Sequence, residues 1–354
     1  MTLLKDTRNF LARERGWALL FIFLISLIAF NLVWHTKPEK QTSEAVKQLE
    51  QAETRLKTQI REAGGIEAFL TKRPRLMVAF NAFTFLLVVT LVLGIFINVS
   101  WVRRPDWRSR LRVEDPPDAP YWGLGTIFKV ALFFISVVLA VGLLLSFIGS
   151  HFFPESGMNL MALVHTTVAD FLCVGSILYF VGRQGGSWRD LGLKKIHLWE
   201  DLKIGIAGYA AILPFFFLTL MGVALLASIF SYEPPPHPLV GIFLEEEKRS
   251  PFTVVYSIFL ACVAAPVLEE IFFRGFCYPA FKKRWGVMRS LCLSSAFFAL
   301  IHENLFAFVP IFILGLGLGY LYEKRGTLFP SILLHIMHNS IFIAYFFLAK
   351  KILT

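Results

Sequence analysis

The stretch LEEIFFRGF places two carboxylates and a guanidinium inside an otherwise apolar run. An ionisable residue at membrane depth costs at least about 2.5 kcal/mol, so three of them close together need a reason. Glu269 and Glu270 cannot face the same way, because each residue of a helix turns by about 100°. Arg274 follows Glu270 by four residues and is its neighbour on one helix face. We predict a buried Glu270–Arg274 pair, which leaves the charge of Glu269 for another role. The alternative is an ion cluster that only holds helices together.

Two further apolar runs carry polar side chains at helical spacing. FFALIHEN places His302 four residues after Phe298. SILLHIMHNS places His335 four residues before Asn339. At 1.5 Å per helical residue, Glu269 and the two histidines lie roughly 7–20 Å from the basic residues that flank these runs. We therefore expect the three side chains to meet in one half of the bilayer.

A glutamate, two histidines and an asparagine form a hydrolytic set. Two imidazoles and a carboxylate can bind Zn²⁺ with an open position for water, so Glu269, His302 and His335 are candidate zinc ligands. Alternatively, they hold the water directly, with the carboxylate as general base and a histidine as acid. Asn339 could donate to the oxyanion of a tetrahedral intermediate, a contact that contributes about 2.7–4 kcal/mol in other hydrolases. The chain contains no HExxH and no GxSxG motif, which excludes the common zinc-protease helix.

The elements that must position these side chains are transmembrane helices. Of 354 residues, 56% are hydrophobic and 17% are charged, whereas a soluble domain is about 25% charged. We predict an all-α polytopic bundle with an intramembrane catalytic cavity. The net charge of +10 lies in short clusters between apolar runs, as it does in the loops of membrane proteins. Membrane lipids, and not nucleic acid, are therefore the expected partners. The four cysteines lack metal-ligand spacing and are expected to be buried small hydrophobes.

Nine apolar runs predict about eight to nine spans. They lie at 17–34, 76–101, 124–149, 159–182, 204–230, 252–277, 290–307, 308–322 and 330–349. The run at 308–322 is short and rich in glycine, which predicts a tightly packed inner helix. The alternation of basic loops places the N-terminus in the cytoplasm. Lys350 and Lys351 would then lie on the outer side, against this rule.

The N-terminal part of the chain is expected to stand apart from the core. The run at 17–34 follows a basic start, is long enough to span and is predicted to be an uncleaved signal anchor. Segment 36–75 has mixed charges and apolar residues near helical spacing, which predicts an amphipathic arm outside the bilayer. This arm is either a substrate or partner arm, or a solvated connector. The predicted division is a signal-anchor span at 1–35, the helical arm at 36–75, accessory transmembrane helices at 76–184 and a catalytic core at 185–354.

EExxxR, FxxxH and HxxxN, each on its own apolar helix and in this order, resemble the motifs of the CAAX-protease and bacteriocin-processing family. These are intramembrane endopeptidases that include the Ras-converting protease. The upstream WRDLGLKK also resembles a segment of that family, and the likeness covers about residues 185–349. It implies a helical membrane core with a cavity open to the cytoplasmic side. The implied catalytic residues are Glu269, Glu270, Arg274, His302, His335 and Asn339.

The resemblance also implies a role for each of these residues. Glu269 with the two histidines positions the attacking water, Glu270 with Arg274 orients the site, and Asn339 stabilises the oxyanion. The motifs leave open whether the mechanism uses a metal, such as Zn²⁺, or a glutamate base alone. The substrate would be a membrane-associated peptide or protein, either lipidated or signal-like. The expected location is a bacterial inner or plasma membrane.

Two other functions compete with the protease. A transporter or proton-coupled carrier could use buried Glu, His and Arg side chains as a relay, but the chain has no obvious internal repeat. A non-catalytic protein that confers immunity to a peptide has no physical need for the complete set. His165 and Asp170 are further ionisable residues in an apolar run, and they line the cavity, bind substrate or hydrogen-bond across helices. His338 is expected to be structural.

Overall fold

The computed structural model describes residues 16–17, 19–24, 44–105, 120–152, 158–194, 197–232, 238–246 and 250–353. Within these ranges the chain forms helices and no strand, which confirms the all-α prediction. From Glu44 onward, the helices are α3 (Glu44–Ala63), α4 (Ile66–Thr71), α5 (Pro74–Val102), α7 (Leu124–Phe152), α8 (Met158–Arg183), α9 (Leu198–Ile229), α10 (Pro238–Glu245), α11 (Pro251–Phe259), α12 (Ala265–Glu270), α13 (Tyr278–Trp285), α14 (Val287–Leu300), α15 (Leu305–Arg325) and α16 (Phe329–Leu353). Two π-helical segments, η2 (Leu260–Ala264) and η3 (Ile271–Cys277), flank α12.

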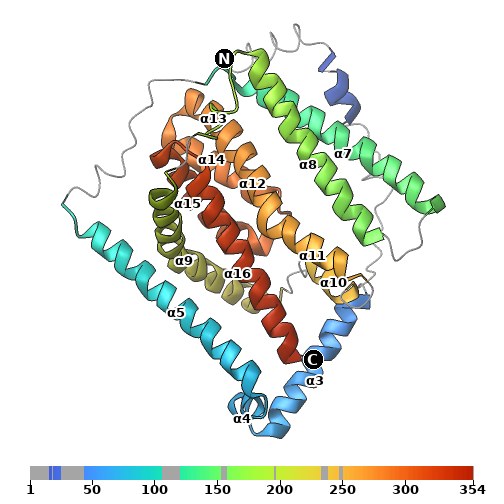
Figure 1. The fold of residues 1–354 in the computed structure, drawn as a ribbon, viewed down its shortest axis with the longest axis vertical. Helices are drawn as coiled ribbons and strands as arrows, with labels where there is room; N and C mark the ends of the chain where they lie inside the picture. The colour runs from blue at the N-terminus through green and yellow to red at the C-terminus, as the bar shows by residue number, and fades with distance from the viewer. Residues whose placement is uncertain are drawn as a thin grey trace.

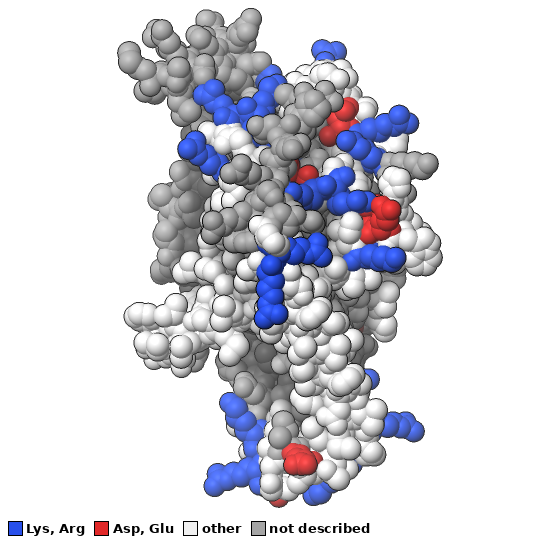
Figure 2. Space-filling model, turned by 90° about the vertical axis from the view of Figure 1, so that its left-hand side faces the viewer, with Lys and Arg blue, Asp and Glu red and all other residues white. Residues whose placement is uncertain are grey.

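Seven helices of the described ranges are long and apolar enough to cross a membrane. They cover Pro74–Val102, Leu124–Leu145, Asn159–Arg183, Leu198–Ile229, Pro251–Trp285, Leu305–Arg325 and Phe329–Lys351. Lys and Arg side chains gather over the upper part and again at the lower end of the molecule, with an uncharged band between them (Figure 2). The protein is therefore an integral membrane protein. Most of the predicted signal anchor at 17–34 lies outside the described residues.

The predicted span at 290–307 is wrong, because the helix there ends too early. Helix α14 has 14 residues and is followed by a turn. In this turn Glu303 has a φ of +49°, which a right-handed helix does not contain. The side chain of Asn304 then accepts a hydrogen bond from the backbone N–H of Ala307 and caps the next helix. That helix, α15, has 21 residues, so the glycine-rich run predicted at 308–322 is part of a full-length span.

Helix α15 packs tightly inside the bundle, as its glycines predict. A Cβ atom at Gly315 would lie 3.0 Å from the Cβ of Ser295 in α14. One at Gly317 would lie 3.0 Å from the side chain of Ile212 in α9. Both distances are closer than ordinary carbon contacts of about 3.5–4.0 Å. The absent side chains therefore allow α15 to lie against both neighbours.

The central bundle consists of α9, α14, α15 and α16, packed with the long rod that α11 to α13 form. Helices α7 and α8 pair with each other, and α8 contacts α11, α12 and η3 of the rod. Helix α5 packs against α9. In Figure 1, α5 and the α7–α8 pair lie on opposite sides of the central helices.

The rod at Pro251–Trp285 is one continuous helix in which two π-helical segments interrupt the α-helical winding. Segment η2 comes directly before α12 and η3 directly after it, so the acidic pair at the end of α12 lies between two π-helical segments. Such turns are rare and are frequent at functional sites. No residue pattern in the sequence predicts these two segments.

The loop before α9 ties the rod to the start of α16. Leu191 is fully buried in this loop. A Cβ atom at Gly275 would lie 2.6 Å from the carbonyl oxygen of Leu191, so only glycine fits there without movement of the backbone. Gly192, at a φ of +83°, accepts a hydrogen bond of 3.0 Å from the backbone N–H of Leu328. The segment WRDLGLKK therefore helps to fix the helices that carry the polar motifs.

Segment 36–75 contains α3 and α4, and its first eight residues lie outside the described ranges. Leu56 and Ile60 of α3 pack against Phe69 and Leu70 of α4. Helix α3 also contacts α10 and α16. The location of this arm outside the bilayer and the division into domains stay predictions.

Candidate active site

Glu270 and Arg274 form the buried ion pair that their spacing predicts. Arg274 Nη1 donates to Glu270 Oε1 over 2.7 Å, and the two side chains are 1% or less exposed. Arg274 Nη2 donates to the carbonyl oxygen of Gly315 over 3.2 Å. The guanidinium also lies 4.4 Å from the ring centroid of Phe298, within range of a cation–π contact. The pair is therefore held by both α14 and α15.

His335 of α16 lies between the two carboxylates of the acidic pair. Its Nδ1 is 3.0 Å from Glu270 Oε1, and its Nε2 is 3.7 Å from Glu269 Oε2. The side chain of Glu269 is 28% exposed, whereas that of His335 is 3% exposed. A separation of 3.7 Å is too long for a hydrogen bond, and a water molecule can contact both atoms. Glu269 therefore has its carboxylate on the accessible side of the buried pair.

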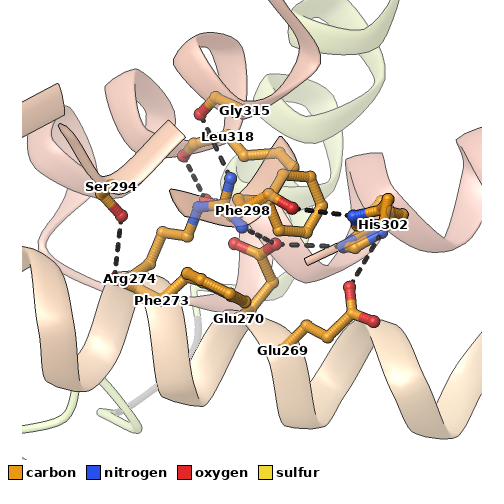
Figure 3. A network of polar contacts seen from close by, with 11 residues as sticks. Glu269, Glu270, Phe273, Arg274, Ser294, Phe298, His302, Gly315 and Leu318 are labelled. Atoms are coloured by element: carbon orange, nitrogen blue, oxygen red, sulfur yellow. Dashed lines mark hydrogen bonds and ion pairs between the residues drawn. The ribbon is translucent and has the colours of Figure 1, made fainter. Parts of the chain in front are cut away.

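His302 lies in the turn after α14 and not within a helix. Its Nδ1 is 2.7 Å from the carbonyl oxygen of Phe298. The ring of Phe298 packs against both imidazoles, with centroid distances of 4.8 Å to His302 and 5.5 Å to His335. Figure 3 shows Glu269, Glu270 and His302 gathered around this phenylalanine. The Phe298 ring therefore sets the spacing of the two histidines.

The hydrogen bonds define which ring nitrogen of each histidine carries the proton. A backbone carbonyl and an ionised carboxylate can only accept hydrogen bonds. Nδ1 of His302, which contacts the Phe298 carbonyl, and Nδ1 of His335, which contacts Glu270, must therefore donate. In the neutral imidazole each Nε2 then keeps a lone pair. An Nε2 lone pair of His335 and the carboxylate of Glu269 can accept the two hydrogen bonds that one water molecule donates.

Asn339 lies one helical turn beyond His335 and contacts the rod. Its Nδ2 donates to the carbonyl oxygen of Ala261 in η2 over 2.8 Å. An amide has two N–H donors. One of them therefore holds α16 to η2, and the predicted role as an oxyanion donor depends on the other.

The zinc site predicted at Glu269, His302 and His335 stays a prediction. Within the described residues, no group of three His, Cys, Asp or Glu side chains is placed to hold a metal ion. The donor types of these three residues suit zinc, which would polarise a water molecule if it were bound there.

Helix α8 brings one more acidic residue near the site. Helix α8 carries Asp170 and contacts α12, the helix that carries Glu269. The sequence signal for Asp170 is its charge within an apolar run, but no motif includes it. His165 instead contacts the carbonyl oxygen of Val138 in α7 at 2.9 Å, which agrees with the alternative of a hydrogen bond across helices.

His338 is buried away from the acidic pair, among aromatic rings. Its ring centroid lies 4.7 Å from that of Phe216 and 4.7 Å from that of Phe342. Tyr209 is a further neighbour at 6.2 Å. This surrounding fits the structural role expected for His338.

Two contacts of the site use backbone oxygens that the sequence analysis missed. They are the carbonyl of Gly315, which accepts from Arg274, and the carbonyl of Ala261, which accepts from Asn339. Every residue has a carbonyl group, so no residue type could have marked these two. Only the packing of the helices selects them.

Comparison with known proteins supports the assignment made from the motifs. Residues 251–341 match the model of a family described as type II CAAX prenyl endopeptidase Rce1-like. The match runs from α11 into α16 and contains all three motifs. No curated protein and no solved structure matches the chain significantly. In this segment the chain is similar to the CAAX-protease family, which supports the resemblance that the motifs indicate.

Proposed function

We propose that the protein hydrolyses a peptide bond of a membrane-associated peptide or protein, with a water molecule held by Glu269, His302 and His335. The observation that carries this proposal is the position of His335, which bonds the buried Glu270 through Nδ1 and turns Nε2 toward Glu269. The buried ion pair thereby orients an imidazole next to an accessible carboxylate. Such an arrangement is suited to proton transfer at a bound water.

In the proposed reaction Glu269 takes a proton from the water, and the oxygen attacks the carbonyl carbon of the substrate. The resulting oxyanion accepts a hydrogen bond from the N–H of Asn339 that does not contact Ala261. The proton then passes from Glu269 to Nε2 of a histidine, which donates it to the amide nitrogen as the C–N bond breaks. The products are a carboxylate and an amine. Glu270 and Arg274 do not touch the substrate and act by positioning His335.

We further propose that the substrate enters from the cytoplasmic side. The support is the basic end of α13, with Lys282, Lys283 and Arg284 in its last turn. Basic residues mark cytoplasmic ends of membrane helices. The substrate is either lipidated or signal-like, because both kinds of chain reach the site from the membrane.

Cleavage of a peptide library by purified protein in liposomes tests the proposal. The library contains lipidated and signal-like peptides, and the variants are Glu269→Ala and His302→Ala, with Glu303→Ala as the matched control. We expect each of the first two to lower the cleavage rate by at least about a hundredfold, while the control cleaves like the wild type. Circular dichroism and gel filtration verify that each variant is folded.

Cleavage that persists in folded Glu269→Ala would contradict the proposed mechanism. The same assay with a chelator distinguishes the two chemistries that the motifs leave open. Full activity with the chelator supports a glutamate base, and loss of activity that added Zn²⁺ restores would require a metal.

A further inference from the structure

A pocket lies between the start of α5 and the end of α16, apart from the candidate active site. It has a volume of about 610 Å³. Arg73, Arg75 and Lys351 line it with positive charge, and Leu76, Ala79 and Leu348 line it with apolar surface. Leu348 follows His335 by 13 residues on α16, which at 1.5 Å per residue is roughly 20 Å along the helix. The pocket is therefore separate from the candidate active site.

Among the described residues, no acidic side chain pairs with the three basic side chains of this pocket. The guanidinium of Arg73 stacks on the ring of Phe69 at 4.6 Å, and Arg75 and Lys351 are exposed. Like charges around one pocket repel each other. An anion bound between them would remove that repulsion.

The apolar lining points to a ligand that also has a hydrocarbon chain. Arg73 and Arg75 flank the first residue of α5, where the candidate span begins at Pro74. Further along α5, Phe83 contacts Tyr345 of α16, with ring centroids 6.0 Å apart. The charges thus lie at the end of the span, at the depth of lipid headgroups, and the apolar surface extends along it. Arg and Lys side chains are the groups that bind phosphate oxygens in proteins.

We infer that this pocket binds an anionic phospholipid, with its phosphate between Arg73, Arg75 and Lys351 and an acyl chain along Ala79 and Leu348. This site lies outside the family match at 251–341 and does not depend on the peptidase proposal. It also gives a reason for a basic residue at the end of α16, where the alternation of charged loops disfavours one.

Lipid binding to purified protein in neutral detergent tests the inference. The affinity for phosphatidylglycerol and for phosphatidylcholine is measured by native mass spectrometry, with inorganic phosphate as a competitor. The pocket variant is Arg73→Gln/Arg75→Gln/Lys351→Gln. The control variant, Arg55→Gln/Arg61→Gln/Lys72→Gln, removes the same charge from exposed positions near the same end of the molecule. We expect the pocket variant to bind phosphatidylglycerol more weakly by about fivefold for each charge removed, and the control to bind like the wild type.

A steric variant tests the apolar half of the site with all charges present. Ala79→Trp fills the pocket. Val78→Trp introduces the same side chain at an exposed position that does not line the pocket. We expect only Ala79→Trp to lower the affinity, by at least about tenfold.

Three results would overturn the inference. The first is equal binding of phosphatidylcholine and phosphatidylglycerol, and the second is an equal loss in the two charge variants. The third is full displacement of the lipid by inorganic phosphate, which would make the site one for a free anion. Because Arg73 packs on Phe69, the double variant Arg75→Gln/Lys351→Gln is measured as well, so that a folding defect at Arg73 cannot decide the result.

Discussion

At the scale of single residues, the site depends on one buried charge pair. Glu270 Oε1 accepts hydrogen bonds from both Arg274 and His335, at 2.7 Å and 3.0 Å. Neutralising Glu270 would leave the charge of Arg274 buried without its partner. It would also weaken the hydrogen bond that orients the imidazole of His335. The pair thus connects the stability of the bundle to the orientation of the imidazole.

Removal of one member of this pair should be more damaging than removal of both. We expect Glu270→Gln and Arg274→Met each to lower the free energy of unfolding by about 3–5 kcal/mol, because each leaves an uncompensated buried group. The double variant should regain most of this loss. Titration with a denaturing detergent measures all three, and a double variant whose loss equals the sum of the single losses would contradict the coupling.

The sequence already predicts most of the contacts at this scale. The four-residue spacing identifies the Glu270–Arg274 pair, and the motifs identify the two histidines. The bond between His335 and Glu270 and the contact of Asn339 with Ala261 were not predicted. Both join segments that are 65 and 78 residues apart. Helical periodicity gives no information on pairs of that separation.

At the scale of elements, the site requires a rigid rod, because the rod carries Glu269, Glu270 and Arg274. The acidic pair lies between two π-helical segments, and Leu191 fits against Gly275 in the second of them. The sequence predicts a single apolar run here but no change of winding, because π-helical bonding has no residue signature. It also predicts a helix through His302, because the run FFALI continues the apolar pattern up to the turn.

Gly275→Ala tests the contact between the loop and the rod. The added Cβ would lie 2.6 Å from the backbone carbonyl of Leu191, so we expect the free energy of unfolding to fall by about 1–3 kcal/mol. Gly222→Ala, at a helical glycine with no atom within 4 Å of the added Cβ, is the control. Thermal unfolding in detergent compares the two. Equal stability of both variants would show that the loop at Leu191 moves to accommodate the added methyl group and that the contact is not a tight one.

At the scale of the whole molecule, entry of the substrate from the cytoplasm requires that the protein has one defined orientation in the membrane. Basic loops predict that the end with α13 faces the cytoplasm and that the arm at 36–75 lies on the opposite side. The uncharged band between two groups of basic side chains agrees with a membrane-spanning body but does not distinguish its two faces (Figure 2).

Cysteine labelling in intact cells determines this orientation. A membrane-impermeant maleimide should label Gln59→Cys, which lies on α3, in intact cells. Lys203→Cys, near the start of α9, should react only after permeabilisation. Both positions are exposed, and Cys292→Ser in the background removes the one exposed native thiol. The reverse labelling pattern would place the opening of the site on the outer face.

The most direct test of the central claim is the single-turnover cleavage rate of Glu269→Gln, a variant that keeps the size of the side chain and removes its ability to take a proton. Its matched control is Glu303→Gln, the same change in the turn that carries His302. We predict a rate about a hundredfold to ten-thousandfold below that of the wild type for Glu269→Gln and an unchanged rate for the control. A Glu269→Gln rate within a few-fold of the wild type would contradict the claim that this carboxylate activates the water.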